Sequence, residues 1–511
     1  MSNEFFTHHS LLTTKELLKS LEPVSIGQVT AAMNGRLLQG NPETVVSGIA
    51  IDSRGVNPGQ LFFAFSGSRA DGHWYVGDAL SRGAAAAVIS RQVPVESGQP
   101  LIMVADPLQA LQDLAGYYRR LFPAPVVAVT GSTGKTTTKD LIAGVLATGM
   151  RVLKTEGNQN NEIGLPLTLM RLTHDYDAVV LEMAMRGRGE IAALCRISQP
   201  QVGVITNIGM THIERLGSEQ AIAEAKGELL EALPLNGCAV LNGEDPWQRQ
   251  LASKCRSEVI FYGLDGGAVS AAAVSAQNIV LHGLQGTEFL LRTPLGETPC
   301  RLPLLGRHNI SNALAAAGVG SRFGLQPEQI AHGLATVSLT GMRQEAKQGI
   351  GGSTIIDDTY NASPASVKAA LRLLADVTDR AGTEASPGTR VPTGVGAAES
   401  KPAHRGRAIA VLGNMYELGP ETVSGHRAVG EYAATLQIDY LFTVGDLAGE
   451  IARAARDAGL PGTRIGVFDD NRGAIAFMRD FVKSGDVVLV KGSRAARMEE
   501  IVAPLSEGGL T

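Results

Sequence analysis

Cysteine is scarce in this chain of 511 residues. The four cysteines are scattered, with no C-x-x-C pair among Cys195, Cys238, Cys255 and Cys300. Disulfide frameworks and metal sites need closer spacing, so we expect four reduced thiols. No apolar run approaches the roughly 18 residues that would span a membrane. The N-terminal segment lacks a basic stretch followed by an apolar core, which argues against a secretory signal. We therefore expect a cytoplasmic protein without membrane insertion.

An excess of basic side chains is also missing. Lys and Arg number 45 against 50 Asp and Glu, which gives a formal net charge of −5. A general nucleic-acid binder would need a basic surface, so we expect no nucleic-acid partner. The chain has 60 glycines, which suit the tight strand-to-helix turns of an α/β protein. The length suggests about three domains.

Apolar runs and turn signals separate three regions, at 1–122, 123–338 and 339–511. In the first, expected strands at 48–52 and 60–66 precede an expected helix at 107–121, and Pro123 and Pro125 mark the boundary. In the second, expected strands at 126–130, 177–183, 202–207 and 238–242 alternate with helical patterns. This alternation indicates a parallel sheet covered on both faces.

The same rhythm returns in the third region at 354–358, 408–413, 440–445 and 486–491. Residues 379–407 interrupt it and are rich in Gly, Pro, Ser, Thr and Ala, so we expect a flexible surface insertion there. The predicted fold class is α/β with three domains. They are a small mixed α/β N-terminal domain, a central parallel-sheet domain like the P-loop ATPases, and a Rossmann-like C-terminal domain.

A glycine-rich loop after the strand expected at 126–130 is the strongest motif. Backbone N–H groups of such a loop, and of the helix expected at 136–147, bind phosphate oxygens. Lys135 would reach the terminal phosphates and the Thr136 hydroxyl would bind Mg²⁺. The loop is shorter than the general motif, but strand, loop, lysine, hydroxyl and helix occur in order. A chance Gly/Thr-rich turn is the alternative; we expect ATP to bind at Gly131, Ser132, Thr133, Gly134, Lys135, Thr136 and Thr137.

Two more polar side chains are expected at the same edge of the central sheet. Glu182 ends the strand expected at 177–183, and His212 follows the one at 202–207. Ligands of open parallel sheets bind at the carboxyl ends of the strands, and a carboxylate near a phosphate loop is a natural ligand of Mg²⁺. Glu182 is therefore a candidate metal ligand. His212 is a weaker candidate, since a lone histidine is more often structural.

A lysine occupies an apolar helix face. The helix expected at 218–233 has Ser218 as its N-cap and an apolar stripe of Ile222, Leu229, Leu230 and Leu233. Lys226 falls within that stripe. A buried ammonium must be paired or chemically changed, whereas the simpler alternative is that the side chain extends to water.

Longer stretches along nearly the whole chain match the motifs of one known family. In the first region these are DSR (52–54), PGQLFFA (58–64) and DGH (71–73). In the second they are VTGSTGKTTTK (129–139), GNQNNEIGLPLTL (157–169), ITNIGMTHIERLGS (205–218), IAEAKGE (222–228) and LGRHNISNA (305–313). In the third they are DDTYNASP (357–364), VLGNMYELG (411–419) and VKGS (490–493). With these stretches the chain resembles the Mur ligases, which join a carboxylate to an amine with ATP. Ala184 departs from the family's usual glycine.

The resemblance is strongest to the member that adds D-alanyl-D-alanine to UDP-N-acetylmuramoyl-tripeptide through an acyl phosphate, a step of peptidoglycan synthesis. It implies a cytoplasmic monomer that uses ATP and two Mg²⁺ ions. It also implies that Lys226 is carbamylated to N6-carboxylysine. Thr136, Glu182, His212 and this modified lysine would hold the metals, and Lys135, Lys226 and His212 would be the catalytic residues.

The resemblance also implies binding roles at matching positions. The UDP end of the substrate would lie against Ser53 and Arg54, and the remainder near Asn158, Asn161, Tyr360 and Asn361. The adenine would lie near Asn309 and Asn312, with Arg343 and Asp358 on phosphate and ribose.

Three alternatives stay open. The first is the Mur ligase that adds the third amino acid, but the Asp-Asn-Pro-Arg motif of that enzyme is absent here. The second is a folylpolyglutamate synthase, which lacks a first domain of this kind. The third is a catalytically silent ATP-binding scaffold, against which the candidates at Lys135, Glu182 and Lys226 argue.

Overall fold

The computed structural model describes residues 21–67, 70–209, 211, 213–264, 273–378 and 406–506. The chain divides into two compact units. The first comprises residues 1–128, 150–184 and 190–201, and the second comprises 129–149, 185–189 and 202–511. The predicted insertion at 379–407 lies outside the described residues except for Gly406 and Arg407. The three domain boundaries stay predictions.

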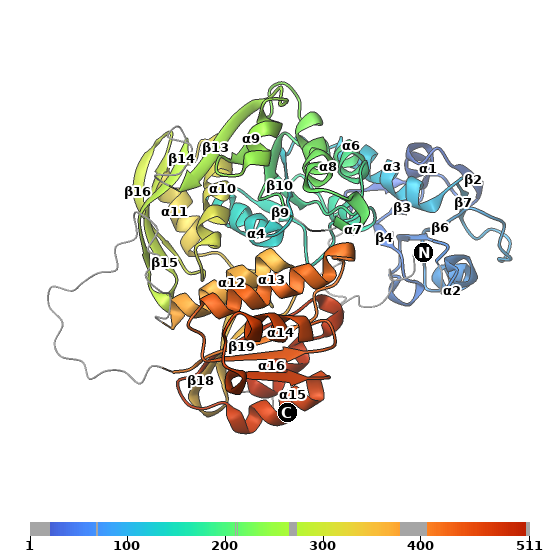
Figure 1. The fold of residues 1–511 in the computed structure, drawn as a ribbon. Helices are drawn as coiled ribbons and strands as arrows, with labels where there is room; N and C mark the ends of the chain where they lie inside the picture. Colours follow the sequence, from blue (N-terminus) through green and yellow to red (C-terminus); the bar gives the residue numbers. More distant parts are fainter. Residues whose placement is uncertain are drawn as a thin grey trace. The chain divides into compact units, whose positions relative to one another are not determined.

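The first unit contains a five-stranded sheet with the order β2-β7-β6-β5-β4 (Figure 1). Its strands are β2 (Arg36–Gln39), β4 (Gly48–Ala50), β5 (Gln60–Phe63), β6 (Ala86–Ile89) and β7 (Leu101–Met103). β4 to β7 are parallel, and β2 runs antiparallel to β7. Every residue of β5 and β6 is buried, as expected for strands with both faces covered. β1 (Val24–Ser25) and β3 (Val45–Val46) form a separate two-stranded antiparallel sheet. The helices here are α1 (Ile26–Ala32), α2 (Val76–Ser81) and α3 (Pro107–Arg119).

The remainder of the first unit supplies two parallel strands, β9 (Val152–Lys154) and β10 (Ala178–Glu182). They are accompanied by α5 (Gly164–Leu169) and α6 (Glu190–Ser198). Buried Arg119 stabilises the C-terminal end of α3, because its guanidinium donates to the carbonyl oxygens of Phe122, Ala124 and Ser198. The division between the units falls within β8 (Val126–Thr130).

In the second unit the strand order is β16-β15-β14-β13-β12-β11-β8. The bounds are β11 (Val202–Ile205), β12 (Cys238–Asn242), β13 (Glu258–Leu264), β14 (Val274–Leu281), β15 (Thr287–Thr293) and β16 (Gly296–Leu302). The helices are α4 (Lys135–Leu146), α7 (Ile213–Leu216), α8 (Glu219–Glu231), α9 (Pro246–Ala252), α10 (His308–Arg322) and α11 (Pro327–Ala335). β11 and β12 are parallel as predicted, and β13 and β14 continue the parallel part, whereas β14, β15 and β16 are antiparallel. The antiparallel strands were not predicted; Gly286 and Gly296 have positive φ and allow the tight turns between them.

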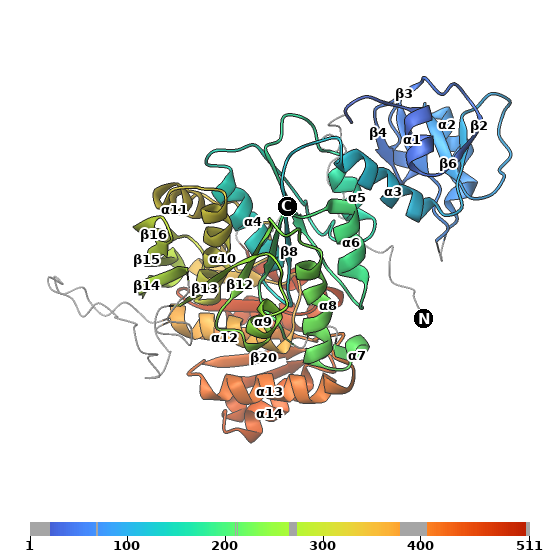
Figure 2. The ribbon, with the colours of Figure 1, turned by 90° about the horizontal axis from the view of Figure 1, so that it is seen from above.

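The C-terminal part of the second unit has a six-stranded sheet with the order β17-β18-β22-β19-β20-β21. The strands are β17 (Glu345–Gly349), β18 (Ser353–Asp358), β19 (Ala408–Gly413), β20 (Tyr440–Val444), β21 (Ile465–Phe468) and β22 (Val487–Lys491). All pairs are parallel except β17 with β18. Consecutive residues of β18 alternate between two cores. Ile356 packs with α12 (Pro364–Val377), α13 (Thr422–Thr435) and α14 (Gly449–Asp457). Ile355 packs with α15 (Asn471–Phe481) and α16 (Glu499–Leu505). All five helices are labelled in Figure 1, and α12, α13 and α14 also in Figure 2. This arrangement confirms the predicted α/β class and places the ends of β18, β19 and β22 at one edge.

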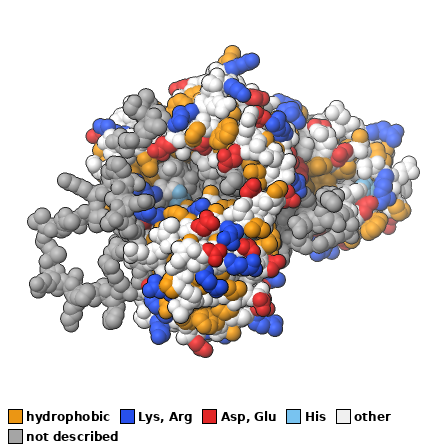
Figure 3. Space-filling model, in the orientation of Figure 1, with side chains coloured by type: hydrophobic (Ala, Val, Ile, Leu, Met, Phe, Trp, Pro, Cys, Tyr) orange, Lys and Arg blue, Asp and Glu red, His pale blue; other side chains and the backbone are white. Residues whose placement is uncertain are grey.

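Basic and acidic side chains are interspersed over the described part of the face shown in Figure 3. Among the described residues, no helix is long and apolar enough to span a bilayer. All four cysteines are free thiols, and burial raises the pKa of Cys238 and Cys300 to about 12.

Candidate active site

The phosphate loop lies between the buried strand β8 and α4, as the sequence predicts. Gly131 and Gly134 have φ of +148° and +76°, a region that residues with a side chain rarely adopt. Lys135 folds back over the loop, where its Nζ donates to the carbonyl oxygens of Gly131 at 2.8 Å and Ser132 at 3.3 Å. The ammonium group is therefore held at the loop. Thr136 and Thr137 are buried in the first turn of α4.

The end of β11 holds the loop in place. The Thr206 hydroxyl donates to the carbonyl oxygen of Thr133 at 2.6 Å. Asn207 Oδ1 accepts from the Thr133 N–H at 3.0 Å, and Asn207 Nδ2 donates to the Thr133 carbonyl at 3.0 Å. Ser132 exchanges two hydrogen bonds with Gly209. The sequence motif at 205–218 covers Thr206 and Asn207, but the prediction assigned them no role.

Gly134→Ala is expected to lower both the stability of the fold and the affinity for ATP. A Cβ at this residue would lie 2.7 Å from Asn312 Oδ1, and φ is +76°. The left-handed backbone alone costs about 1–2 kcal/mol. Gly324 is a matched control, because its φ is +75° and a Cβ there would meet nothing within 4 Å. We expect chemical denaturation to show a larger loss of stability for Gly134→Ala than for Gly324→Ala, and ATP titration to show weaker binding only for Gly134→Ala. Equal effects of both changes would contradict this role of the loop.

Lys226 lies on α8, which Ser218 caps as predicted by accepting from the Ala221 N–H at 3.1 Å. The lysine is 2% exposed and belongs to the buried face of the helix. Extension of the side chain to water is therefore excluded. Burial, together with the nearby charge of Lys135, holds the pKa of Lys226 well below its usual value.

Glu182 ends β10 in the first unit and is 2% exposed. Its Oε1 accepts from Asn160 Nδ2 at 2.7 Å. Its Oε2 is buried and has no hydrogen-bond partner among the described residues. A buried carboxylate oxygen without a partner is costly, and a cation would satisfy it. Asn160 was not predicted as a site residue, although it lies between two that were.

The other predicted residues of the first unit have varied surroundings. Asn158 is exposed, whereas Asn161 Oδ1 accepts from the N–H groups of Ile163 and Gly164 at the start of α5. Ser53 is buried in a short helical turn. Arg54 is exposed and bound to Asp52, with 2.6 Å between Nη2 and Oδ2.

The motif at 71–73 has a structural role in the first unit. His73 is buried, and its Nε2 accepts from the Ser90 N–H at 3.0 Å. The ring proton must therefore be on Nδ1, which donates to Asp71 Oδ1 at 2.6 Å. Asp71 also binds Arg91 at 2.7 Å, and this hydrogen bond is the main reason that the pKa of Asp71 lies well below its usual value.

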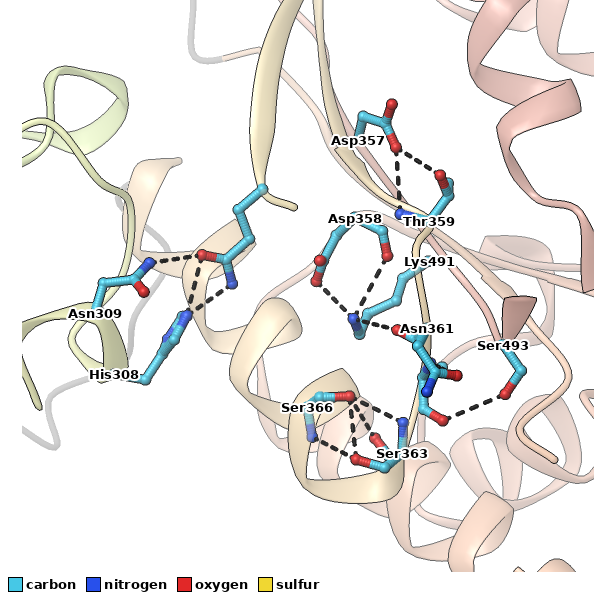
Figure 4. Close-up of polar contacts among 12 residues, drawn as sticks. His308, Asn309, Asp357, Asp358, Thr359, Asn361, Ser363, Ser366, Lys491 and Ser493 are labelled. Atoms are coloured by element: carbon cyan, nitrogen blue, oxygen red, sulfur yellow. Dashed lines mark hydrogen bonds and ion pairs between the residues drawn. The ribbon is translucent and has the colours of Figure 1, made fainter. Parts of the chain in front are cut away.

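The two asparagines predicted near the adenine lie on α10 and are buried. Asn312 Nδ2 donates to Asn309 Oδ1 at 2.9 Å, and Asn312 Oδ1 accepts from the Thr138 hydroxyl at 3.2 Å. Asn309 Nδ2 donates to Gln344 Oε1 at 2.9 Å (Figure 4). Through Thr138 the pair is joined to the helix that follows the phosphate loop.

Asp358 ends β18 and forms a buried ion pair that the sequence did not predict. Lys491 Nζ at the end of β22 lies 2.7 Å from Asp358 Oδ2 and donates to the Asn361 carbonyl at 2.9 Å (Figure 4). The two residues are 3% and 8% exposed. Ser493, just after β22, contacts the segments that follow β18 and β19. Its hydroxyl donates to the Ala362 carbonyl after β18 and accepts from the Tyr416 N–H after β19.

Arg343 and Tyr360 meet as a cation–π pair, with the guanidinium carbon 3.9 Å from the ring centroid. Arg343 Nε is buried without a hydrogen-bond partner in the described part of the chain. The structure thus brings Arg343, Asp358, Tyr360 and Asn361 together at one sheet edge. His212 lies outside the described residues. Within the residues that are described, no three His, Cys, Asp or Glu side chains form a metal-binding group.

Comparison with known families gives matches to three domain models. They are "Mur ligase family, catalytic domain" over residues 45–119, "Mur ligase middle domain" over 129–320, and "Mur ligase, glutamate ligase domain" over 393–494. The chain is 37% identical to the UDP-N-acetylmuramoyl-tripeptide–D-alanyl-D-alanine ligase of Bacillus subtilis, covering 92% of this chain and 95% of that one.

Two solved structures are similar over most of their length. A crystal structure of MurF from Acinetobacter baumannii has a TM-score of 0.82 and 30% identity, covering 94% of this chain and 98% of that one. The MurF ligase of Thermotoga maritima in complex with ADP has a TM-score of 0.75 and 28% identity, covering 89% and 96%.

Proposed function

Because the chain belongs to the Mur ligase family and joins D-alanyl-D-alanine to UDP-N-acetylmuramoyl-tripeptide, we propose that it does so through an acyl phosphate formed with ATP at the site around Lys135 and Lys226. The similarity to the Bacillus subtilis ligase over most of both chains carries the substrate assignment. ATP as the phosphoryl donor agrees with the phosphate loop and with the ADP in the Thermotoga maritima structure.

The nucleotide would lie across the second unit. Loop N–H groups, Lys135 and Thr136 would bind the phosphates. Asn309 and Asn312 would flank the adenine, Asp358 would bind the ribose, and Arg343 would bind phosphate. The buried charge on Lys491 and the stacking ring of Tyr360 would hold these last two side chains in position.

The proposal includes two Mg²⁺ ions. Glu182 supports this, because its Oε2 is buried without a hydrogen-bond partner among the described residues. Mg²⁺ is usually bound by one or two carboxylates together with substrate phosphates, so a cluster of three acidic side chains is not required. Glu182, Thr136, His212 and a carbamylated Lys226 would hold the ions. When bound, they would offset the charge of the transferring phosphoryl group.

Carbamylation accounts for a lysine on a buried helix face. A neutral amine attacks CO₂, forms an N–C bond and releases a proton, which turns the side chain into a carbamate anion. The lowered pKa of Lys226 favours the reactive neutral form. The product is N6-carboxylysine, whose carboxylate would remove the repulsion between Lys226 and Lys135.

The UDP end of the precursor would lie against Ser53 and Arg54, and its peptide near Asn158, Asn161, Tyr360 and Asn361. A carboxylate oxygen of the tripeptide attacks the γ-phosphorus, and ADP leaves. The amine of D-alanyl-D-alanine then attacks the acyl carbon and phosphate leaves. Lys135 stabilises the charge of the transferring group, while positioning supplies most of the remaining rate enhancement. The proposal includes a monomer in the cytoplasm, where ATP and UDP-linked sugars occur.

Phosphate release is expected to depend on ATP, UDP-N-acetylmuramoyl-tripeptide and D-alanyl-D-alanine together. A coupled assay that omits each substrate in turn measures this, and mass spectrometry identifies the pentapeptide product. A parallel assay supplies the dipeptide precursor with meso-diaminopimelate or lysine. Release in that assay alone would identify the ligase that adds the third residue. Absence of release with every pair would support a silent scaffold.

A further inference from the structure

A continuous row of buried and partly buried side-chain hydrogen bonds joins the phosphate-loop helix to Gln344, which precedes β17. It runs from Thr138 on α4 through Asn312 and Asn309 on α10 to the Gln344 carboxamide, with distances of 3.2, 2.9 and 2.9 Å. His308 also contacts this carboxamide, and Figure 4 shows His308 and Asn309 turned toward the same group.

The direction of every hydrogen bond in the row is fixed. The Leu305 carbonyl can only accept, so the atom 2.8 Å from it must be Asn309 Nδ2. Asn309 Oδ1 therefore faces Asn312 Nδ2, and the second proton of Asn309 Nδ2 goes to Gln344 Oε1. Both protons on Asn309 Nδ2 are then in use. The Gln344 side chain has only one orientation that satisfies this row.

His308 provides a second contact to the Gln344 carboxamide. Gln344 Nε2 lies 2.8 Å from His308 Nε2, which accepts when the ring is neutral. Burial lowers the pKa of His308, as does Lys491, while Asp358 and the Gln344 hydrogen bond oppose this. His308 Nε2 also lies 3.0 Å from Gln344 Oε1, so His308 and Asn309 both contact this one carboxamide.

The backbone around Gln344 needs such an anchor. Met342 and Gln344 have φ of +62° and +52°, which residues with a Cβ rarely adopt. Arg343 lies between them, with its guanidinium over Tyr360 and its Nε buried without a partner in the described chain. Strained backbone persists only where its surroundings hold it, and the Gln344 side chain supplies two of the contacts that do so.

We propose that Gln344 is a positioning residue, whose carboxamide, held by Asn309 and His308, fixes the strained segment that presents Arg343 to the transferring phosphate. This role rests on the proposed function, which places nucleotide phosphate at Arg343. It links the helix of the phosphate loop to the arginine through the side chains of Asn312, Asn309 and Gln344 and the peptide bond between Gln344 and Arg343. Gln344 itself touches no reacting atom.

The test compares turnover of Gln344→Ala, the near-isosteric Gln344→Met, Arg343→Ala and the double variant Arg343→Ala/Gln344→Ala with the wild-type chain. We expect kcat to fall about 10- to 100-fold in each Gln344 variant, with KM for ATP changing by less than about threefold. The double variant should be no slower than Arg343→Ala, because Gln344 acts through that residue. Gln348→Ala is the control, since this exposed glutamine lies on β17 nearby. It should match the wild type.

Three results would overturn the role. One is a raised KM for ATP with unchanged kcat, which would mean that Gln344 only shapes the base pocket. Another is a double variant whose loss equals the product of the single losses. The last is unchanged turnover in both Gln344 variants. Thermal melting identifies any variant that has not folded, and the other substitution is then used. An inactive wild type would overturn the proposed function, whereas an active wild type with unaffected variants would overturn only the role of Gln344.

Discussion

Replacement of Lys226 by alanine is expected to reduce product formation on the order of a thousandfold, the scale for removal of a group that stabilises developing charge. The chain should stay folded. A buried lysine amine without a counter-charge contributes little to stability, so Lys226→Met should melt at or above the wild-type temperature. Loss of turnover with an intact fold separates a chemical role of Lys226 from a structural one.

Short carboxylates such as acetate or formate should partly restore the turnover of Lys226→Ala, because they can occupy the space of the carbamate. Depletion of CO₂ should lower wild-type activity and bicarbonate should restore it. The activity of Lys226→Ala should not change under either condition. Exposed Lys254→Ala, on the segment after α9, is the matched control and should behave as wild type. Normal activity of Lys226→Ala would contradict the carbamate proposal.

Lys491→Met is expected to lower the free energy of unfolding by about 3–5 kcal/mol. The substitution leaves the Asp358 carboxylate buried without its cation, and the Asn361 carbonyl loses a donor. Urea denaturation measures the change. Activity should also fall, since Asp358 is the proposed ribose contact.

Lys347→Met provides the comparison. Lys347 pairs with Asp357 at 2.7 Å, but it is about one-third exposed, and Asp357 keeps the hydroxyl and N–H of Thr359. We expect a loss of about 1 kcal/mol there. Adding Asp358→Asn to Lys491→Met should recover part of the lost stability, because the unpaired charge is gone. A double variant as unstable as Lys491→Met would contradict this explanation.

The local features of the fold could be predicted from the sequence. β12 and β19 have the predicted bounds, Ser218 caps α8, and Lys226 is buried where the apolar stripe placed it. These features depend on neighbouring residues, so periodicity and capping chemistry are sufficient to find them. The antiparallel strands β15 and β16 were not predicted, although alternate residues of β16 are buried.

The missed site residues depend on contacts between distant segments. Lys491 and Asp358 are 133 positions apart in the sequence, and Gln344 and Asn309 are 35 positions apart. Lys491 and Asn207 lie in motifs that carry the family resemblance, but the motifs do not indicate which residues these two side chains contact. Gln344 lies outside every motif, and only the direction of its hydrogen bonds identifies it. The roles assigned to all the predicted site residues, from Ser53 to Asn361, stay predictions.

The row of carboxamides has a spectroscopic consequence. Side-chain NH₂ protons of exposed asparagines exchange rapidly with solvent and have similar chemical shifts. Both protons of Asn309 are instead buried and bound to different acceptors, so the pair should be widely separated in an ¹H–¹⁵N spectrum and slow to exchange. Asn309 would thus serve as an internal NMR probe, without an added label, for the moment at which a nucleotide reaches α10.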